Sequence, residues 1–212
     1  MKPSTTVDSV ANALRAALQA GRWAPGTALR QEELASEFGV SRIPIREALT
    51  RLQAEGLIVV ERNRGAYVPL LTPAEVAEIF DLRVLLETDA LRHAVPRHTP
   101  RSIRHLEAVQ RDLDDEADPS QWLAGDTAFH AALYAPSQRR RTIEAIATLR
   151  AAVSRFYLAH LSPSTRRDAW NHEHHALVTA VADADADCAV ATLTGHLRAT
   201  AATALAALEP SR

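Results

Sequence analysis

Two polar residues, Asp126 and His130, interrupt an apolar stripe in a segment with helical spacing. The stripe consists of Trp122, Leu123, Phe129 and Leu133. A carboxylate that faces a protein core is costly unless it is paired or bound to a metal. Because Asp126 and His130 lie one turn apart, both side chains can reach a single ion. The other interpretation is a buried Asp–His pair without a metal.

Two further histidines, His174 and His196, lie on either side of a predicted turn near Ala184. At a rise of ~1.5 Å per residue they lie about 15 and 18 Å from that turn, at similar heights on antiparallel helices. Three imidazoles and the Asp126 carboxylate around one cavity can bind a divalent transition metal. Zinc is favoured, with nickel or manganese as alternatives. Histidines that form hydrogen bonds within a core are the competing interpretation.

A second group of candidate residues lies near the start of a helix predicted over 41–54. Arg42 and Arg46 are four residues apart, so they project from one side of that helix, and Thr50 continues that side. The opposite side carries Ile45, Leu49 and Leu52. A guanidinium donates two hydrogen bonds to O6 and N7 of guanine, so this pair suits base reading. The alternative is a solvated helix face on which Arg42 and Arg46 pair locally with Glu47.

The elements before residue 70 would position this helix against DNA. Helices are predicted over 7–20, 31–38 and 41–54, and Ser41 is expected to cap the third through its hydroxyl. A hairpin is predicted from residues 57–60 and 66–68, with Arg62, Arg64 and Gly65 at its turn. Those turn residues suit contact with phosphates or the minor groove. Two short helices followed by a two-stranded wing are typical of a winged helix-turn-helix.

The remainder of the chain is predicted to be wholly helical. Pro69 and the Thr72-Pro73 pair mark a boundary, which gives a DNA-binding domain over 1–70, a linker over 71–73 and a helical domain over 74–212. The expected helices cover 74–94, 100–116, 120–135, 138–160, 165–182 and 185–208. The fold class is therefore mainly α, with an N-terminal winged helix-turn-helix and a C-terminal helical bundle.

Composition restricts the class of protein further. The single cysteine among 212 residues excludes an intrachain disulfide, which points to a reducing cytoplasm. No apolar run approaches the ~20 residues of a membrane span, and Asp8 and Asn12 interrupt any signal peptide. We therefore expect a cytoplasmic protein without a membrane partner. The net charge of −2 leaves room for a local basic surface.

Residues 10–69 carry a dense series of motifs: Gly21-Arg22, Pro25-Gly26-Thr27, Glu33-Leu34-Ala35, Gly39-Val40-Ser41-Arg42, Pro44-Ile45-Arg46-Glu47-Ala48-Leu49, Glu55-Gly56-Leu57 and Asn63-Arg64-Gly65-Ala66-Tyr67-Val68. They resemble the GntR family of bacterial transcription regulators. The resemblance implies that Arg42 and Arg46 read bases, that Arg51 contacts phosphate and that Gly65 is the wing-tip glycine. Relatives often carry a DNA-contacting arginine where this chain has Glu32, so that contact is lost or moves to Arg30. The predicted DNA-contacting set is Arg30, Ser41, Arg42, Arg46, Thr50, Arg51, Arg62, Arg64 and Gly65.

Residues 74–205 resemble the FadR-type effector domain called FCD. The resemblance rests on residues 78–87 and on Asp126, Phe129-His130, Leu133, Glu173-His174, Leu177, Ala180-Val181 and His196-Leu197. It implies a divalent metal held by Asp126, His130, His174 and His196, a small carboxylate effector and a homodimer. Arg83 is a candidate partner for the effector carboxylate, with an intrahelical pair to Glu87 as its alternative. His175 is a reserve ligand.

We therefore expect a DNA-binding transcriptional regulator, a repressor rather than an activator, whose affinity for operator DNA is controlled by a small organic acid bound at the metal. A metalloenzyme of hydrolase type is the alternative from another class, because such a metal can activate water. No HExxH motif or nucleophile elbow accompanies the predicted ligands, so we expect no enzyme. A direct metal-ion sensor is the third interpretation.

Overall fold

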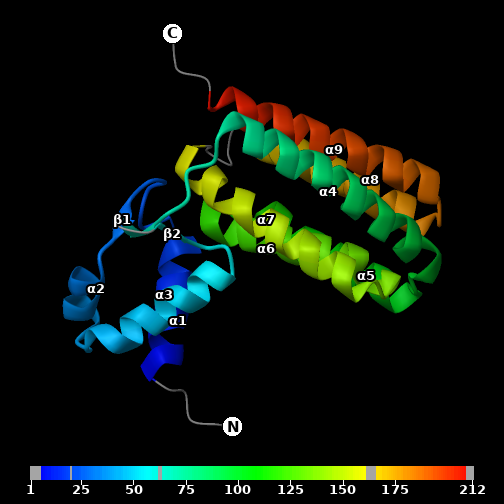
Figure 1. Ribbon diagram of the computed structural model, residues 1–212. Coiled ribbons are helices and arrows are strands. Elements are labelled where there is room, and N and C mark those ends of the chain that lie inside the picture. Colours follow the sequence, from blue (N-terminus) through cyan, green and yellow to red (C-terminus); the bar gives the residue numbers. More distant parts are fainter. Residues whose placement is uncertain (1–5, 20, 62–63, 161–165, 209–212) are drawn as a thin grey trace. The chain divides into compact units, whose positions relative to one another are not determined.

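The computed structural model describes residues 6–19, 21–61, 64–160 and 166–208 (Figure 1). These residues form two compact units: one holds the described residues up to Leu71 together with 154–159, and the other holds the rest. Within these residues, no helix combines the length and the apolar composition that crossing a membrane requires.

The N-terminal unit is a winged helix-turn-helix. Its elements are α1 (Thr6–Gln19), β1 (Ala28–Leu29), α2 (Gln31–Phe38), α3 (Arg42–Ala54), β2 (Val59–Glu61) and β3 (Gly65–Tyr67). Leu14 of α1 and Ile45 and Leu52 of α3 are fully buried in one apolar core. Burying each such side chain contributes roughly 1.5–3 kcal/mol, so this core fixes the third helix with its arginine-bearing side outward.

The wing contains one strand more than the sequence predicted. β1 pairs antiparallel with β3, so the sheet order is β1-β3-β2 rather than a simple hairpin. The turn before β1 returns the chain alongside β3, where Gly26 N donates to Val68 O at 2.9 Å. Because β1 has only two residues, it is too short to leave a periodic pattern in the sequence.

The connection between α2 and α3 differs in one detail from the expected capping. Gly39 adopts the left-handed conformation, with φ of 62°, and its amide bonds back to the end of α2. Ser41 occupies the N-cap position of α3 in an extended conformation, but its hydroxyl makes no capping hydrogen bond. The expected Ser41 cap is therefore wrong, and that hydroxyl remains on the exposed surface.

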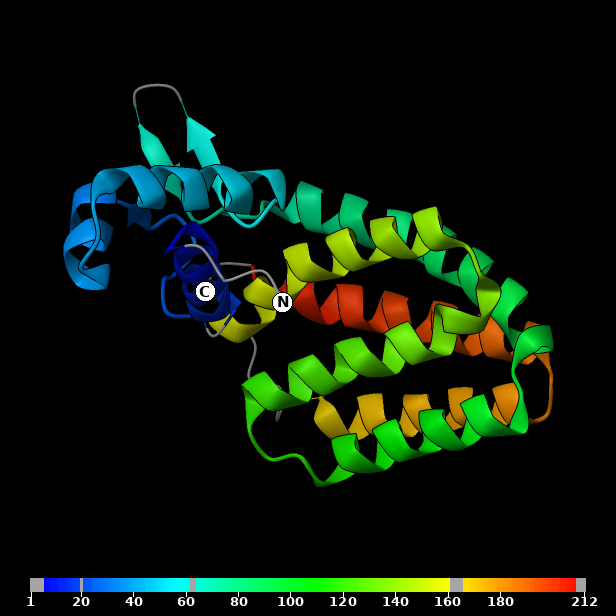
Figure 2. The same cartoon turned by 90° about the horizontal axis from the view of Figure 1, so that it is seen from below.

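The C-terminal unit is all-helical. Its elements are α4 (Pro73–Ala94), η1 (Val95–Arg97), α5 (Pro100–Asp115), α6 (Pro119–Tyr134), η2 (Ala135–Ser137), α7 (Arg140–His160), α8 (Arg167–Ala182) and α9 (Ala186–Ala206). α9 packs between α4 and α8, and α5 packs against both α8 and α6 (Figures 1 and 2). The mainly α fold with a winged N-terminal unit confirms the predicted fold class.

Local signals set the ends of these helices. Thr72 and Glu75 form a capping box at the start of α4, with Pro73 inside it. α7 begins two residues later than predicted, because Gln138 is in the left-handed conformation with φ of 59° and cannot be part of the helix.

Candidate metal centre and DNA-binding surface

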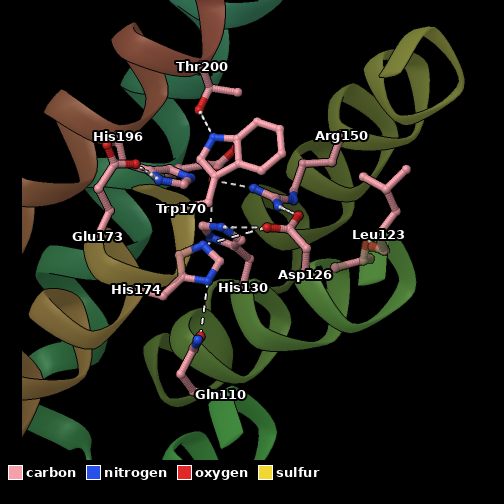
Figure 3. A network of polar contacts seen from close by, with 12 residues as sticks. Gln110, Leu123, Asp126, His130, Arg150, Trp170, Glu173, His174, His196 and Thr200 are labelled. Atoms are coloured by element: carbon pink, nitrogen blue, oxygen red, sulfur yellow. Dashed lines mark hydrogen bonds and ion pairs between the residues drawn. The ribbon is translucent and has the colours of Figure 1, made fainter. Parts of the chain in front are cut away.

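Three imidazoles from different helices meet inside the C-terminal unit. His130 of α6, His174 of α8 and His196 of α9 are buried, and their ligand-capable nitrogens all lie within 4.8 Å of one another. Asp126, one turn before His130, places Oδ1 3.6 Å from Nε2 of both His130 and His174 (Figure 3). The structure thus brings together the carboxylate and the histidines that the sequence singled out.

Each of these imidazoles uses its Nδ1 atom in a hydrogen bond with a different neighbour. His130 Nδ1 lies 2.9 Å from the Tyr134 hydroxyl, and His174 Nδ1 lies 3.1 Å from Gln110 Oε1. His196 Nδ1 lies 2.7 Å from Glu173 Oε2. Glu173 can only accept a hydrogen bond, and it holds the Nδ1 proton on His196.

The same proton assignment follows for the other two rings. The Tyr134 hydroxyl donates to Glu87 Oε2 at 2.6 Å, and Gln110 Nε2 donates to Asp114 Oδ1 at 2.8 Å. Tyr134 and Gln110 therefore offer oxygen acceptors to His130 and His174. All three imidazoles carry their proton on Nδ1, which leaves each Nε2 with a lone pair for another partner.

Two of these lone pairs lack a partner. Nε2 of His130 and Nε2 of His174 are buried without any hydrogen bond among the described residues. A buried polar atom without a partner is rare, and a binding site for an ion or ligand is one cause. Two atoms that each lie ~2.1 Å from one tetrahedral ion are about 3.4 Å apart, close to the separations from Asp126 Oδ1. Nitrogen and carboxylate donors suit zinc, so these residues fit a divalent transition metal.

The environment keeps the two most deeply buried imidazoles neutral. Burial lowers the pKa of His130 well below its usual range, and the positive charge of Arg150 lowers it further. Burial likewise lowers the pKa of His174, with His196 and Arg150 as additional causes. A neutral imidazole is the form that binds a metal.

A buried charge network that the sequence analysis missed surrounds this cluster. Arg150 of α7 donates from Nη2 to Asp126 Oδ2 at 2.5 Å and from Nη1 to Glu87 Oε2 at 3.1 Å. Burial would raise the pKa of Glu87, but Arg83, Arg150 and Tyr134 hold it below its usual value. The signal was present, because Arg150 interrupts the apolar stripe of Ile143, Ile146 and Val153 just as Asp126 interrupts its own.

Two candidate residues do not touch the imidazole cluster. Arg83 is buried and donates from Nε to Glu87 Oε1 at 2.6 Å, so it forms the intrahelical pair, and Glu87 Oε2 in turn lies 3.9 Å from His130 Nδ1. His175 is exposed, and its Nε2 lies 3.0 Å from Asp114 Oδ2. Neither side chain therefore supplies an atom to the cluster.

The predicted DNA-reading side of α3 is exposed. Arg42, Arg46 and Thr50 all face solvent within the N-terminal unit, and Thr50 Oγ1 donates to Arg46 O at 2.9 Å. Arg42 Nη1 lies 2.9 Å from Glu32 Oε1 rather than pairing with Glu47. A hollow of about 500 Å³ brings together four predicted DNA-contacting residues, Arg30, Arg42, Arg64 and Gly65.

Three described arginines of the predicted DNA-contacting set form exposed ion pairs. Arg30 pairs with Glu33 at 3.2 Å and Arg51 with Asp8 at 2.5 Å. Arg64 pairs with Glu61 at 3.1 Å and lies over the ring of Tyr67. Gly65 has a φ of 86°, which an L side chain rarely adopts, so glycine suits the tip of the wing. Arg62 lies outside the described residues.

Comparison with known proteins agrees with both halves of this architecture. Residues 6–68 match the family described as bacterial regulatory proteins, gntR family, and residues 78–199 match the FCD domain. A winged DNA-binding unit followed by an FCD domain defines a class of transcription regulator. This chain belongs to the GntR family of DNA-binding transcriptional regulators and carries an FCD effector-binding domain.

Relatives and solved structures extend the similarity over most of the chain. The Nta operon transcriptional regulator of Aminobacter aminovorans is 32% identical over 178 residues, which cover 82% of each chain. The gluconate operon transcriptional repressor of Bacillus subtilis is 48% identical over 132 residues, 61% of this chain and 54% of that protein. The E. coli McbR/YncC structure superimposes with a TM-score of 0.82 at 25% identity and covers 97% of this chain and 99% of that one. The Nta and gluconate operon proteins are both named as regulators of transcription.

Proposed function

We propose that this regulator is a homodimeric repressor whose affinity for operator DNA changes when a small carboxylate binds beside a divalent metal in the C-terminal unit. One observation carries the proposal. Two buried Nε2 atoms, of His130 and His174, have no hydrogen-bond partner among the described residues and both lie 3.6 Å from Asp126 Oδ1. Polar atoms buried in a protein core are normally hydrogen-bonded, so this arrangement points to a further binding partner such as a metal ion.

Asp126, His130, His174 and His196 would hold the metal, with zinc favoured over nickel or manganese. When bound, a divalent ion offers open coordination positions to an anionic ligand. The protein residues orient the site: Tyr134, Gln110 and Glu173 fix the three imidazoles by their Nδ1 protons. Arg83, whose Nε donates to Glu87 Oε1, is the proposed partner for the effector carboxylate.

The N-terminal unit would read operator DNA with α3 in the major groove. Arg42 and Arg46 are assigned to guanines, with Ser41 and Thr50 beside them. Arg30, Arg51, Arg62, Arg64 and Gly65 are assigned to phosphates and the minor groove. The described arginines of this second group form exposed ion pairs with acids of the same unit, and an exposed pair contributes only ~0–1 kcal/mol. Phosphates can therefore replace those acids at little cost.

The repressor and dimer assignments rest on symmetry and on relatives. The gluconate operon protein and RspR of E. coli, 29% identical to this chain over 181 residues, are both named repressors. A two-fold dimer would present two α3 helices to half-sites about one helical turn apart on a pseudo-palindromic operator. Binding in the C-terminal unit need change operator affinity by only ~1–3 kcal/mol to alter occupancy.

The proposed metal site is tested by elemental analysis of full-length protein purified without chelator. We expect about one divalent ion per chain in the natural protein and a large loss in His174→Ala. The control is His172→Ala on the same helix, where the histidine is exposed. Full metal content in His174→Ala would remove this residue from the ligand set.

The proposed regulation is tested on a duplex selected by the protein from a random DNA library. We expect a carboxylate, screened from a panel, to weaken DNA binding only when the metal is present. A large change caused by Zn²⁺ or Ni²⁺ alone would instead identify a direct metal sensor. Carboxylate effects that are equal in natural protein and His174→Ala would contradict the proposed coupling.

A further inference from the structure

The two oxygen atoms of the Asp126 carboxylate face different partners. Its Oδ1 atom lies 3.6 Å from Nε2 of His130 and of His174, where a metal would lie. Its Oδ2 atom accepts a hydrogen bond from Arg150 Nη2 at 2.5 Å (Figure 3). Arg150 is more than nine-tenths buried, so water does little to screen its charge from this carboxylate. The negative charge of Asp126 is therefore already balanced before any ion arrives.

The rest of the network is balanced in the same way. Among the described residues, the inner network holds three carboxylates, Glu87, Asp126 and Glu173, and three guanidinium groups, Arg83, Arg150 and Arg166. The imidazoles are neutral when their protons lie on Nδ1. Asp114 lies further out and faces exposed His175, where solvent screens it. The protein atoms around the imidazoles thus provide no net negative charge for a cation.

A divalent cation in this position would add two positive charges that the described residues do not compensate. Burying uncompensated charge is costly, and pairing it with an opposite charge removes much of that cost. We infer that the site takes its divalent cation together with an anion of charge −2, such as a dicarboxylate, and that Arg150 sets this requirement. The inference rests on the proposed metal site and names the class of anion that the site would prefer.

Arg150 carries the inference because of what it touches. Arg83 bonds to Glu87, and Arg166 bonds to the more exposed Glu173. Among the described residues, Arg150 is the guanidinium that contacts a predicted metal ligand directly. A merely structural Arg150 would join α7 to α4 and α6 and would leave metal binding independent of the anion. The two roles therefore differ in whether the affinity for the metal depends on the anion.

The test measures Zn²⁺ binding to the metal-free full-length protein by equilibrium dialysis, with free Zn²⁺ fixed by a metal-ion buffer. Chloride, acetate, succinate and sulfate are compared at constant ionic strength. We expect a dianion to raise Zn²⁺ affinity by about 5- to 150-fold over chloride, the usual range of coupling between two sites, and acetate to raise it less. By linkage, Zn²⁺ must raise the affinity for that dianion by the same factor.

Variants of Arg150 separate charge from structure. In Arg150→Gln we expect Zn²⁺ to bind more tightly in chloride and the advantage of dianions over acetate to disappear. Arg150→Lys keeps the charge and should retain that advantage. Arg140→Gln is the matched control, because Arg140 lies on the same helix but is exposed. Thermal denaturation checks that each variant folds, and the anion series on the natural protein needs no variant.

Equal Zn²⁺ affinity in chloride, acetate and both dianions would overturn the inference while leaving the metal site in place. An unchanged dianion advantage in folded Arg150→Gln would overturn the role of Arg150. No Zn²⁺ binding under any condition would contradict the proposed function itself, and the inference with it.

Discussion

Arginine–glutamate ion pairs occur in both units of this protein, but they are exposed in the N-terminal unit and buried in the C-terminal unit. In the N-terminal unit, Arg42 pairs with Glu32 while their side chains are 64% and 77% exposed. In the C-terminal unit, Arg83 pairs with Glu87 while theirs are 4% and 0% exposed. Exposed arginines can exchange their partner for a phosphate, whereas buried arginines are fixed parts of the fold. Both pairs join an arginine to a glutamate, so burial and not residue type makes the difference between them.

The energetic consequence differs as well. An exposed ion pair contributes roughly 0–1 kcal/mol, because water solvates both charges whether or not they meet. Removing one partner of a buried pair costs roughly 3–5 kcal/mol, because the remaining charge stays buried without compensation. Substitutions that break an ion pair should therefore lower the free energy of unfolding much more in the C-terminal unit than in the N-terminal unit.

The largest effect is expected at Glu87, which accepts hydrogen bonds from Arg83, Arg150 and Tyr134. Glu87→Ala should lower the free energy of unfolding of the C-terminal unit by about 3–5 kcal/mol, because two guanidinium groups lose their shared carboxylate. Denaturant unfolding followed by circular dichroism measures this loss. The control is Glu55→Ala, which removes the exposed partner of Arg15 and should cost less than about 1 kcal/mol. Similar losses of unfolding free energy in the two variants would contradict the difference expected between buried and exposed ion pairs.

Acidification should be the next largest effect, and it should fall on the C-terminal unit. Burial holds the pKa of His130 and of His174 below the usual ~6.5, so unfolding allows these groups to take up protons. In the metal-free protein, the stability that depends on these neutral histidines is fully present above pH ~6.5. It is lost as the pH falls, by up to ~1.4 kcal/mol per pH unit for each histidine. Unfolding free energies between pH 7.5 and 5.5 measure the slope. His174→Gln should reduce it, and an unchanged slope would contradict the assignment.

In the N-terminal unit, Arg46→Ala should change specificity rather than stability. Loss of one bidentate guanine contact costs about 1–3 kcal/mol of discrimination, while loss of an exposed arginine scarcely alters folding. Competition between the selected duplex and random DNA measures discrimination, and a melting curve checks the fold. Arg22→Ala, which removes an arginine exposed elsewhere in the unit, is the control. Full discrimination by Arg46→Ala would show that α3 reads DNA without this residue.

The smallest effect is expected at Glu32. Glu32→Gln breaks the exposed pair with Arg42 and should alter the free energy of unfolding by less than about 1 kcal/mol. Binding to random DNA at low salt should strengthen a few-fold, because a negative charge beside the proposed DNA-reading arginine is removed. Fluorescence anisotropy measures the affinity. Weaker binding would indicate that the carboxylate itself contacts a base, as a cytosine amino group would allow.

Much of the fold could be predicted because it depends on local signals. α4 begins at Pro73, one residue before its predicted start, and Ile45, Leu49 and Leu52 are buried as their spacing indicated. Where prediction failed, distant partners decide the structure. β1 exists only because β3 lies beside it.

The candidate metal centre shows the same contrast between local signals and distant partners. Spacing placed Asp126 and His130 on one side of a helix, and the interior position of His174 and His196 followed from apolar neighbours. Their role as metal ligands stays a prediction. The apolar pattern did not indicate that Gln110 and Glu173 would bond to His174 and His196, because each of these pairs joins two helices.

The amino-acid sequence alone determined the helices and the arginines exposed on one side of α3, because periodicity acts within a few residues. Only the tertiary structure decided that Arg150 and Glu87 are buried together beside Asp126. That outcome depends on how three helices pack, and the energy of a buried charge depends on neighbours distant in the chain.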